Sequence, residues 1–285
     1  MTYEINVQLS KHLLPSLGES AAVSLAEAAL VQTLEGGRAA LPLLPQVATQ
    51  ALELANKKES TVREFAELIM KDPPIAARFL ATANSALYSR GQTIRSVPDA
   101  VARIGLAASR DLVFQVVYAS SAAGMKHFQA EVQASFHRSV LCGMLCRIAA
   151  PLLGLDVSDA YLCGLLHDIG ESRVYRILDE GKQVPHPVEA SALVRKHHPR
   201  AGAELAMRWA LPDDIVQVCR RHEEPGPPAT DRLRLVRVAD VLAPRVAEPA
   251  GQFPPLADEK LDRLGVSLDL AHTLLQRGVE AATRL

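Results

Sequence analysis

The sequence predicts an all-α fold, and three observations support that prediction. Ala and Leu, which are good helix formers, are abundant, whereas aromatic residues, which favour strands, make up only 4% of the 285 residues. No segment shows the period-two alternation of a half-buried strand, and no internal repeat is present. Proline and glycine instead divide the chain into blocks of helical length.

In the first half, helices are marked by their caps and stops. A helix over residues 19–35 ends before a Gly-Gly pair. Thr61 stands three residues before Glu64, the spacing of a capping box, and opens a helix over residues 61–71. That helix ends at Asp72, because the residue before a proline avoids the α region. The other helices expected here cover residues 41–57, 75–88, 96–105 and 108–123.

The second half is predicted in the same way. A long helix over residues 128–150 stops at Pro151, and the next, 159–170, is capped by Asp156 or Ser158 and ends at Gly170. Further helices are expected at 171–180, 188–197, 199–210, 213–222, 231–246, 257–264 and 267–284. The segment 84–97 joins two helices but carries several apolar side chains, so we expect it to pack against the second half of the chain.

Composition excludes several function classes. The chain has 31 basic and 32 acidic residues, a net charge of −1, so it is not a globally basic nucleic-acid binder, although a local basic patch remains open. No run of about 20 uncharged apolar residues could cross a membrane, and charges interrupt the first twenty residues, where a signal peptide would lie. We expect a cytoplasmic protein with reduced thiols, in which Cys142 and Cys146, one helical turn apart, are small core residues.

The strongest chemical signal is His167-Asp168 within the run GLLHDIG. An imidazole and a carboxylate at one helix end can both reach a metal. Four further candidate ligands lie on other predicted helices: His137, His198, His222 and Asp240. Together they offer up to six nitrogen and oxygen ligands, enough for a mononuclear or dinuclear site holding Fe, Mn, Zn or Mg. The alternatives are that one or two of the histidines are structural, or that no metal binds.

Several cations near these residues suit an anionic ligand, because guanidinium forks match phosphate oxygens. The candidates for anion binding are Lys196, Arg200, Arg221, Arg234 and Arg237. The alternative is that they form a solvated helix face.

The pattern of the second half resembles the HD superfamily, whose signature is His … His-Asp … Asp on a helical bundle. His137 matches the first position, the GLLHDIG run the central pair, and VRVAD, ending at Asp240, the last. Longer motifs narrow the resemblance to the HD-related output domain, HDOD. These motifs are LPLLPQVATQALELAN, FAELIMKDPPIAARFLATANSALYSRG, TIRSVPDAVARIGLAASRDLV and HHPRAGAELAMRWALPDDIVQVCRRHEEP. The resemblance runs from about residue 38 to about residue 246.

This resemblance implies an N-terminal helical lobe packed on an HD-type helical bundle. The implied divisions are an N-terminal extension at 1–37, the lobe at 38–124, the bundle at 125–246 and a C-terminal extension at 247–285. It also implies a bacterial signal-transduction module that acts through protein contacts, with a divalent metal at the six positions named above. The alternative is a metal-dependent phosphohydrolase acting on a cyclic dinucleotide or other nucleotide, with Asp168 and Lys196 as its catalytic residues.

The sequence departs from the related HD-GYP phosphodiesterases at two places. Those relatives carry a His-His-Glu run, in which Arg221 here replaces the first His. Their Gly-Tyr-Pro loop is also replaced, by PGPPAT at residues 225–230. Since that loop helps to seat the substrate in those relatives, we expect little or no phosphodiesterase activity.

Overall fold

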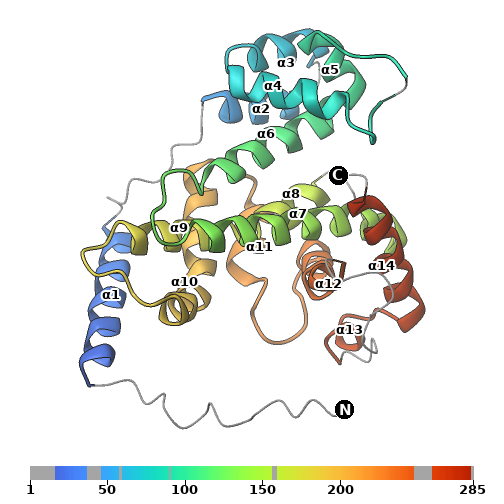
Figure 1. The fold of residues 1–285 in the computed structure, drawn as a ribbon. Coiled ribbons are helices and arrows are strands. Elements are labelled where there is room, and N and C mark those ends of the chain that lie inside the picture. Colours follow the sequence, from blue (N-terminus) through green and yellow to red (C-terminus); the bar gives the residue numbers. More distant parts are fainter. Residues whose placement is uncertain are drawn as a thin grey trace, which may run out of the picture.

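The chain folds into helices throughout the part that the structure describes, a computed structural model covering residues 17–36, 46–57, 60–89, 91–155, 159–246 and 259–283. No strand occurs among these residues, so the all-α prediction is confirmed. A small lobe of short helices lies above a larger bundle, with one helix passing between them (Figure 1).

Short helices build the upper lobe. They are α2 (Gln46–Asn56), α3 (Val62–Ile69), α4 (Pro73–Ala83), α5 (Val97–Ile104) and α6 (Leu106–Ser120). Side chains cap the N-termini of three of them, α3, α4 and α5. The predicted capping box is present: the Glu64 backbone N–H donates to Thr61 Oγ1 at 3.2 Å, and the Thr61 N–H donates to Glu64 Oε2 at 2.9 Å. Together these two bonds satisfy two donors that the helix end would otherwise leave unpaired.

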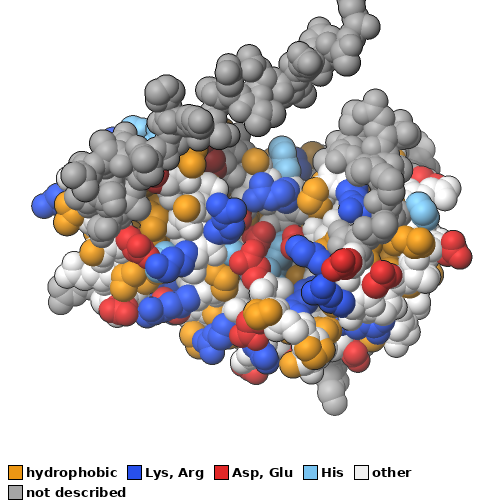
Figure 2. Space-filling model, turned by 90° about the horizontal axis from the view of Figure 1, so that it is seen from below, with side chains coloured by type: hydrophobic (Ala, Val, Ile, Leu, Met, Phe, Trp, Pro, Cys, Tyr) orange, Lys and Arg blue, Asp and Glu red, His pale blue; other side chains and the backbone are white. Residues whose placement is uncertain are grey.

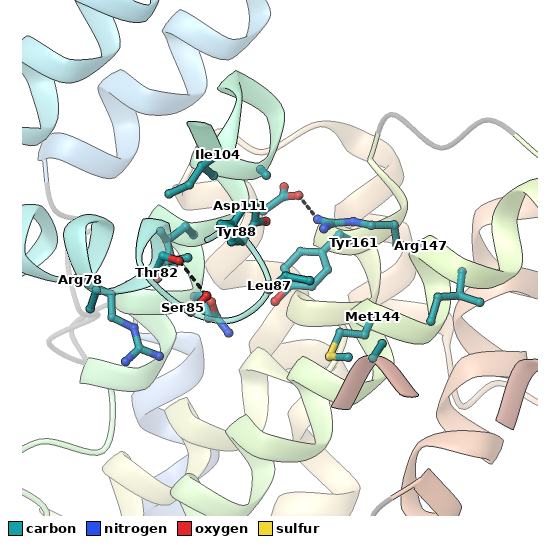
Figure 3. A pocket seen from close by; sticks show the side chains of 16 residues that line it. Arg78, Thr82, Ser85, Leu87, Tyr88, Ile104, Asp111, Met144, Arg147 and Tyr161 are labelled. Carbon is teal, nitrogen blue, oxygen red and sulfur yellow. Dashed lines mark hydrogen bonds and ion pairs between the residues drawn. The ribbon is translucent and has the colours of Figure 1, made fainter. Parts of the chain in front are cut away.

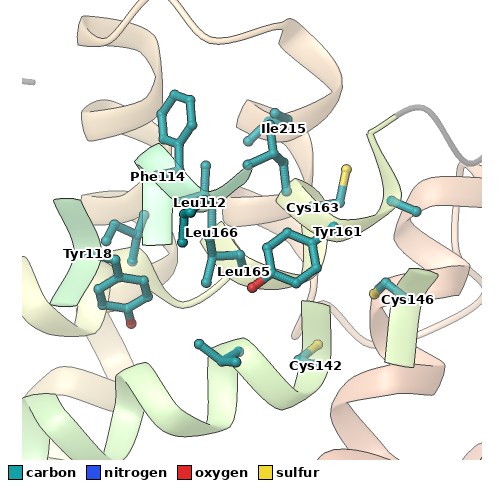
Figure 4. Packing of buried hydrophobic residues seen from close by; sticks show 14 of the residues in the cluster. Leu112, Phe114, Tyr118, Cys142, Cys146, Tyr161, Cys163, Leu165, Leu166 and Ile215 are labelled. Atoms are coloured by element: carbon teal, nitrogen blue, oxygen red, sulfur yellow. The ribbon is translucent and has the colours of Figure 1, made fainter. Parts of the chain in front are cut away.

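The bundle is formed by α7 (Gln129–Leu152), α8 (Ala160–Leu166), α9 (Ile169–Asp179), α10 (Pro187–Arg208), α11 (Asp213–Arg221) and α12 (Asp231–Val246). Helix α6 joins it to the upper lobe, because Leu112, Phe114 and Tyr118 pack near Leu165 and Leu166 of α8 (Figure 4). One continuous hydrophobic core therefore runs from the lobe into the bundle.

Helices from both ends of the chain pack on the bundle. Helix α1 (Leu17–Glu35) buries Leu30 and Leu34 in a second apolar cluster with α9 and α10. Helices α13 (Glu259–Arg263) and α14 (Leu268–Ala282) lie at the other end, where α14 contacts α7 and α12. The divisions expected at residues 37, 124 and 246 remain predictions.

The turn between α4 and α5 is held by hydrogen bonds within the segment 84–97, whose packing against the second half of the chain stays a prediction. The Asn84 side chain accepts the Ile94 N–H at 2.8 Å and donates to the Ile94 carbonyl at 2.8 Å. Tyr88 and Ile94 pack against the continuous core. Helix α4 therefore ends at Ala83 rather than at residue 88, since Asn84 is committed to closing this turn.

Two boundaries in the second half were predicted wrongly. The helix expected over 159–170 breaks in the middle: α8 ends at Leu166 and α9 begins at Ile169, so His167 and Asp168 form the junction and Gly170 lies inside α9. The helices expected at 188–197 and 199–210 are one, because Pro199 removes a single backbone donor while packing against α9 holds both halves in line. The candidate caps Asp156 and Ser158 lie outside the described residues.

Gly170 sets how closely α9 approaches α10. A Cβ atom at this position would overlap the His198 carbonyl oxygen and lie 2.5 Å from the Gly202 nitrogen. Only a hydrogen fits between the two backbones, so α9, which follows Asp168, packs closely on α10, which carries His198.

We expect Gly170→Ala to destabilise the fold by about 3 kcal/mol or more, because neither backbone can move without displacing its helix. The free energy of unfolding from urea titration measures this. Gly181→Ala is the matched control: its added Cβ would meet nothing nearer than the Leu178 carbonyl at 3.2 Å, and it should cost under about 1 kcal/mol. Equal stability of the two variants would contradict this account of the contact.

Candidate metal centre

Five of the six predicted ligands converge at the α8–α9 junction. His167 and Asp168 form the junction, His198 comes from the middle of α10, His222 follows α11, and Asp240 lies on α12. Asp168 is at the centre of the group. Its Oδ2 lies 3.2 Å from His167 Nε2, and its Oδ1 lies 3.4 Å from His198 Nε2 and 3.1 Å from His222 Nε2. Asp240 Oδ1 lies 3.4 Å from His167 Nε2.

Each of the three imidazoles is oriented by its own helix. His167 Nδ1 lies 2.7 Å from the Gly164 carbonyl, His198 Nδ1 3.0 Å from the Val194 carbonyl, and His222 Nδ1 3.1 Å from the carbonyls of Val218 and Cys219. A carbonyl can only accept, so each Nδ1 carries the proton and donates it. In the neutral rings, every Nε2 therefore presents a lone pair to the centre of the group.

This arrangement needs a positive charge at its centre. His198 Nε2 and His222 Nε2 are 3.1 Å apart, and two lone pairs at that distance repel unless a proton or a cation lies between them. His167 Nε2 is fully buried and makes no hydrogen bond. The carboxylates of Asp168 and Asp240 also face the Nε2 atoms, so the electrostatic potential at the centre of the group is negative.

In the absence of metal, protons supply that charge. Burial favours the neutral imidazole, but the carboxylate of Asp168 overrides it and raises the pKa of His167 well above its usual value. The pKa of His198 is raised for the same reasons. Burial would raise the pKa of Asp168, but the facing imidazoles hold it well below the ordinary value.

These residues fit a divalent metal. Neutral imidazole Nε2 atoms with Nδ1 donating to backbone are the usual form of histidine ligands, and the hydrogen bond fixes both tautomer and ring orientation. His167, Asp168 and His222 have ligand atoms within 4.8 Å of one another, and so do His198, His222 and Glu223. The first group would hold one ion and the second could share it or hold another.

Glu223 was not among the predicted ligands. Its Oε2 lies 3.9 Å from His198 Nε2, and its side chain is half exposed. The signal was present in the sequence, because Glu223 follows His222 directly, as Asp168 follows His167. Tyr118 was also missed: its buried hydroxyl lies 3.3 Å from the Asp168 carbonyl oxygen and 3.0 Å from Ser135 Oγ.

His137 is not brought into this group. It lies on α7 with an exposed side chain, next to the ring of Phe136, and it belongs to neither group of ligand atoms. Its role as a ligand stays a prediction.

The predicted anion-binding cations have other partners. Lys196 Nζ pairs with Glu27 of α1 at 2.7 Å, and Arg200 pairs with Glu204 and Glu35. Arg221, which replaces the first His of the His-His-Glu run, pairs through its Nε with Glu224 at 2.7 Å.

Arg234 and Arg237 donate to backbone. Arg234 Nε reaches the Leu264 carbonyl at 2.8 Å. Arg237 donates to the carbonyls of Arg221, His222 and Gly226, all at 2.8–2.9 Å. Both arginines therefore fasten loops onto α12, and their role in anion binding stays a prediction.

A pocket of about 410 Å³ opens beside the group. Its walls include His222, Asp240 and Arg237, together with Lys260 and Arg263 of α13. The C-terminal helices, outside the expected HDOD region, thus bring positive charge next to two candidate ligands.

Most of the chain matches one known protein family. The family described as the HDOD domain matches residues 41–225, well over half of the chain. The chain belongs to the HDOD family.

Individual relatives of this HDOD protein are distant. An uncharacterized protein of Treponema pallidum is 24% identical over 195 residues, which are 63% of this chain and 37% of that protein. Ribonuclease Y of Nitratidesulfovibrio vulgaris is 35% identical over 112 residues, 39% of this chain and 18% of the enzyme. The chain therefore spans little more than a third of the first relative and less than a fifth of the second.

Solved structures share the HDOD fold. A protein of Shewanella amazonensis, named as a candidate phosphohydrolase, superimposes with a TM-score of 0.67 at 24% identity, over 90% of this chain and 98% of that one. An HDOD domain protein of unknown function from Geobacter sulfurreducens gives a TM-score of 0.61 at 23% identity, over 92% and 89%. At these identities the likeness concerns the fold alone.

No helix in the described part of this HDOD protein is both long enough and apolar enough to cross a bilayer. Its four cysteines are all buried and free.

The raised pKa values predict how the metal-free protein responds to pH. A histidine whose pKa is raised by folding stabilises the fold below its unfolded pKa of about 6.5, and that contribution is lost as the pH rises through the folded value. We expect the Tm of EDTA-treated protein to fall from about pH 6.5 upward. Bound Zn²⁺ or Mn²⁺ should remove the fall, because metal requires neutral imidazoles.

Differential scanning fluorimetry across this range, with EDTA or with metal, makes the measurement. The variant His167→Asn should show a shallower fall in EDTA, since it lacks one of the titrating rings. A Tm that rises between pH 6.5 and pH 8 in EDTA would contradict the assignment.

Proposed function

We propose that this chain is a bacterial regulatory HDOD module that retains a divalent-metal centre and acts through contacts with other proteins. The observation that carries the proposal is the shared orientation of three imidazoles, each with Nδ1 bound to its own helix and Nε2 directed at Asp168. An HD bundle with no metal function would have no need to bury three convergent lone pairs beside two carboxylates.

The main effect of a bound metal would be to join helices. His167 and Asp168 precede α9, His198 is on α10, and His222 follows α11, so one ion would tie three separate segments at a single point. Because binding is linked to folding, the metal would set the stability and the relative position of these helices. A module of this kind can present different surfaces to a protein partner with and without metal.

The proposed setting is the cytoplasm, where four buried free thiols would stay reduced. The face shown in Figure 2 carries Lys and Arg side chains interspersed with Asp and Glu, without a broad area of positive charge. That face supports a protein partner over a nucleic-acid one, in keeping with the net charge of −1.

The central experiment is elemental analysis of the purified protein and of single variants. We expect about one divalent ion per chain, Zn, Mn, Fe or Mg. Asp168→Ala should lose metal at least as completely as His167→Ala, because it removes the carboxylate that faces all three rings. His127→Ala is the control and should retain it, since the backbone N–H of His127, not its ring, makes the bond to Asp179.

The same series tests His137, since His137→Ala should lose metal only if that residue is a ligand. Wild-type protein that stays metal-free after dialysis against each of the four metals would overturn the proposal.

The second candidate function is a metal-dependent phosphohydrolase, with a cyclic dinucleotide or other nucleotide as substrate. It is favoured by the pocket beside His222 and Asp240, whose wall holds Arg237, Lys260 and Arg263 as well as Glu223 and Glu224. Arg263 also pairs with Glu259 at 2.9 Å. A bound metal would lower the pKa of a coordinated water and so supply a nucleophile. Asp168 would orient that water and accept its proton, while Lys260 and Arg263 would balance charge on a phosphate.

Three observations favour the regulatory role over this one. Lys196, the expected catalytic cation, is paired with Glu27. All three nitrogens of the Arg237 guanidinium donate to backbone carbonyls. The loop over residues 225–230 is fastened at Gly226 by one of those bonds, so Pro225 and Gly226 form a fixed part of the pocket wall.

We therefore expect hydrolysis of bis(p-nitrophenyl) phosphate and of cyclic di-GMP to stay near background in protein loaded with Mn²⁺ or Fe²⁺. Release of p-nitrophenol and chromatography of the nucleotide products measure the two rates. Metal-dependent turnover well above background in wild type, lost in Asp168→Ala and retained in His127→Ala, would promote the enzyme to first place.

A further inference from the structure

A second pocket lies between the upper lobe and the bundle, away from the candidate metal centre. It has a volume of about 360 Å³ and none of the candidate ligands lines it. Its walls come from α4, from the turn after α4, and from α5, α6, α7, α8 and α14 (Figure 3). A molecule held there would touch both parts of the fold at once.

The floor of this interlobe pocket is a rigid charged group. The buried carboxylate of Asp111 accepts from the guanidinium of Arg110, 3.1 Å from Nη2, and from Arg147. Arg147 also lies over the ring of Tyr161, with 4.5 Å between its Cζ and the ring centroid. Arg110 continues to Asp159 at 3.0 Å. Each charge in this group has a partner of the opposite sign, so the group holds its shape without a ligand.

Other polar groups around the pocket have no such partner. The Tyr161 side chain is more than nine-tenths buried, its hydroxyl points into the pocket, and no described residue hydrogen-bonds to that hydroxyl. Gln115, which is half-buried, and Arg78, which is exposed, also line the pocket, and neither has a hydrogen-bond or ion-pair partner among the described residues. Because the Tyr161 hydroxyl opens to the pocket, a ligand that enters there can supply the acceptor that the fold does not.

Charge and shape define what would fit. Of the three charged residues that line the pocket, Asp111 and Arg147 neutralise each other, which leaves one positive charge on Arg78. Thr82, Ser85 and Gln115 are the uncharged polar residues of the wall, and its large apolar and aromatic side chains include Leu87, Tyr88, Ile104, Leu112, Met144 and Ile148. The volume is near the lower end of the range of about 300–1,000 Å³ for small-molecule sites, which excludes a dinucleotide.

We propose that the interlobe pocket binds a small aromatic monoanion, whose ring lies among the apolar side chains and Tyr161 and whose acid group is held by Arg78. The Tyr161 hydroxyl and the Gln115 amide donate to the same ligand. This site is separate from the metal centre, and it gives the regulatory module proposed above an input that its sequence motifs do not indicate.

The probe for this proposal is 1-anilinonaphthalene-8-sulfonate, an aromatic monoanion whose fluorescence rises when it leaves water. N-phenyl-1-naphthylamine, which has the same ring system without the sulfonate, is the neutral control. We expect the wild type to bind the anionic probe saturably and at least about tenfold more tightly than the neutral one.

Four variants test the location of binding. Arg78→Gln should weaken the anionic probe about tenfold and leave the neutral one unchanged, and Tyr161→Phe should weaken it several-fold. Ala81→Trp, at an exposed wall position, should reduce binding of both by filling the mouth of the pocket. Arg63→Gln removes an exposed arginine of α3 that lies outside the pocket and should change neither.

Circular dichroism and Tm must match the wild type for each variant compared. The proposal is overturned if the wild type shows no saturable binding, or if Arg78→Gln and Ala81→Trp bind the anionic probe as tightly as the wild type does.

Discussion

The candidate metal centre depends on three hydrogen bonds that lie outside it. Each joins an imidazole Nδ1 to a carbonyl three or four residues earlier in the chain, at Gly164, Val194 and Val218. Each ring is thereby held in one tautomer and one orientation, even where the carbonyl has a second partner, as at Val218, which also accepts the His222 backbone N–H. The break between α8 and α9 then places Asp168 where all three Nε2 atoms can reach it. The close approach of α9 and α10 at Gly170 sets the distance between the ring of His167, just before α9, and the ring of His198 on α10.

Local signals in the sequence predicted most of this fold. The Thr61–Glu64 capping box and the helix stop at Asp72 depend only on neighbours in the chain, and both are present. Where prediction failed, the deciding interaction was distant. Gly170 suits a helix terminus by its chemistry, but its place inside α9 follows from contact with α10. Pro199 likewise suits a helix start, and only packing keeps α10 continuous through it.

The site was predictable to a similar extent. His167, Asp168, His198, His222 and Asp240 could be named because the spacing of histidines and aspartates over separate helices is visible in one dimension. The direction of a side chain is not visible there. His137 was chosen because it matches the first position of the HD pattern. The five candidate cations were chosen by their position near the ligands, yet they pair with Glu27, Glu35, Glu204 and Glu224 or donate to backbone carbonyls. Arg221, which replaces a His of the related phosphodiesterases, is paired with Glu224 and so adds no unpaired charge near the centre.

Helix α6 connects the interlobe pocket with the candidate metal centre. Asp111 and Gln115, which line the interlobe pocket, and Tyr118, whose hydroxyl reaches the Asp168 carbonyl, follow one another at intervals of four and three residues. They lie on one face of one rigid rod. If occupancy of the pocket shifts that rod, the affinity for metal must change, and thermodynamic linkage requires metal to change the affinity of the pocket by the same factor. The buried phenol of Tyr118 would then couple ligand binding in the interlobe pocket to metal binding at Asp168.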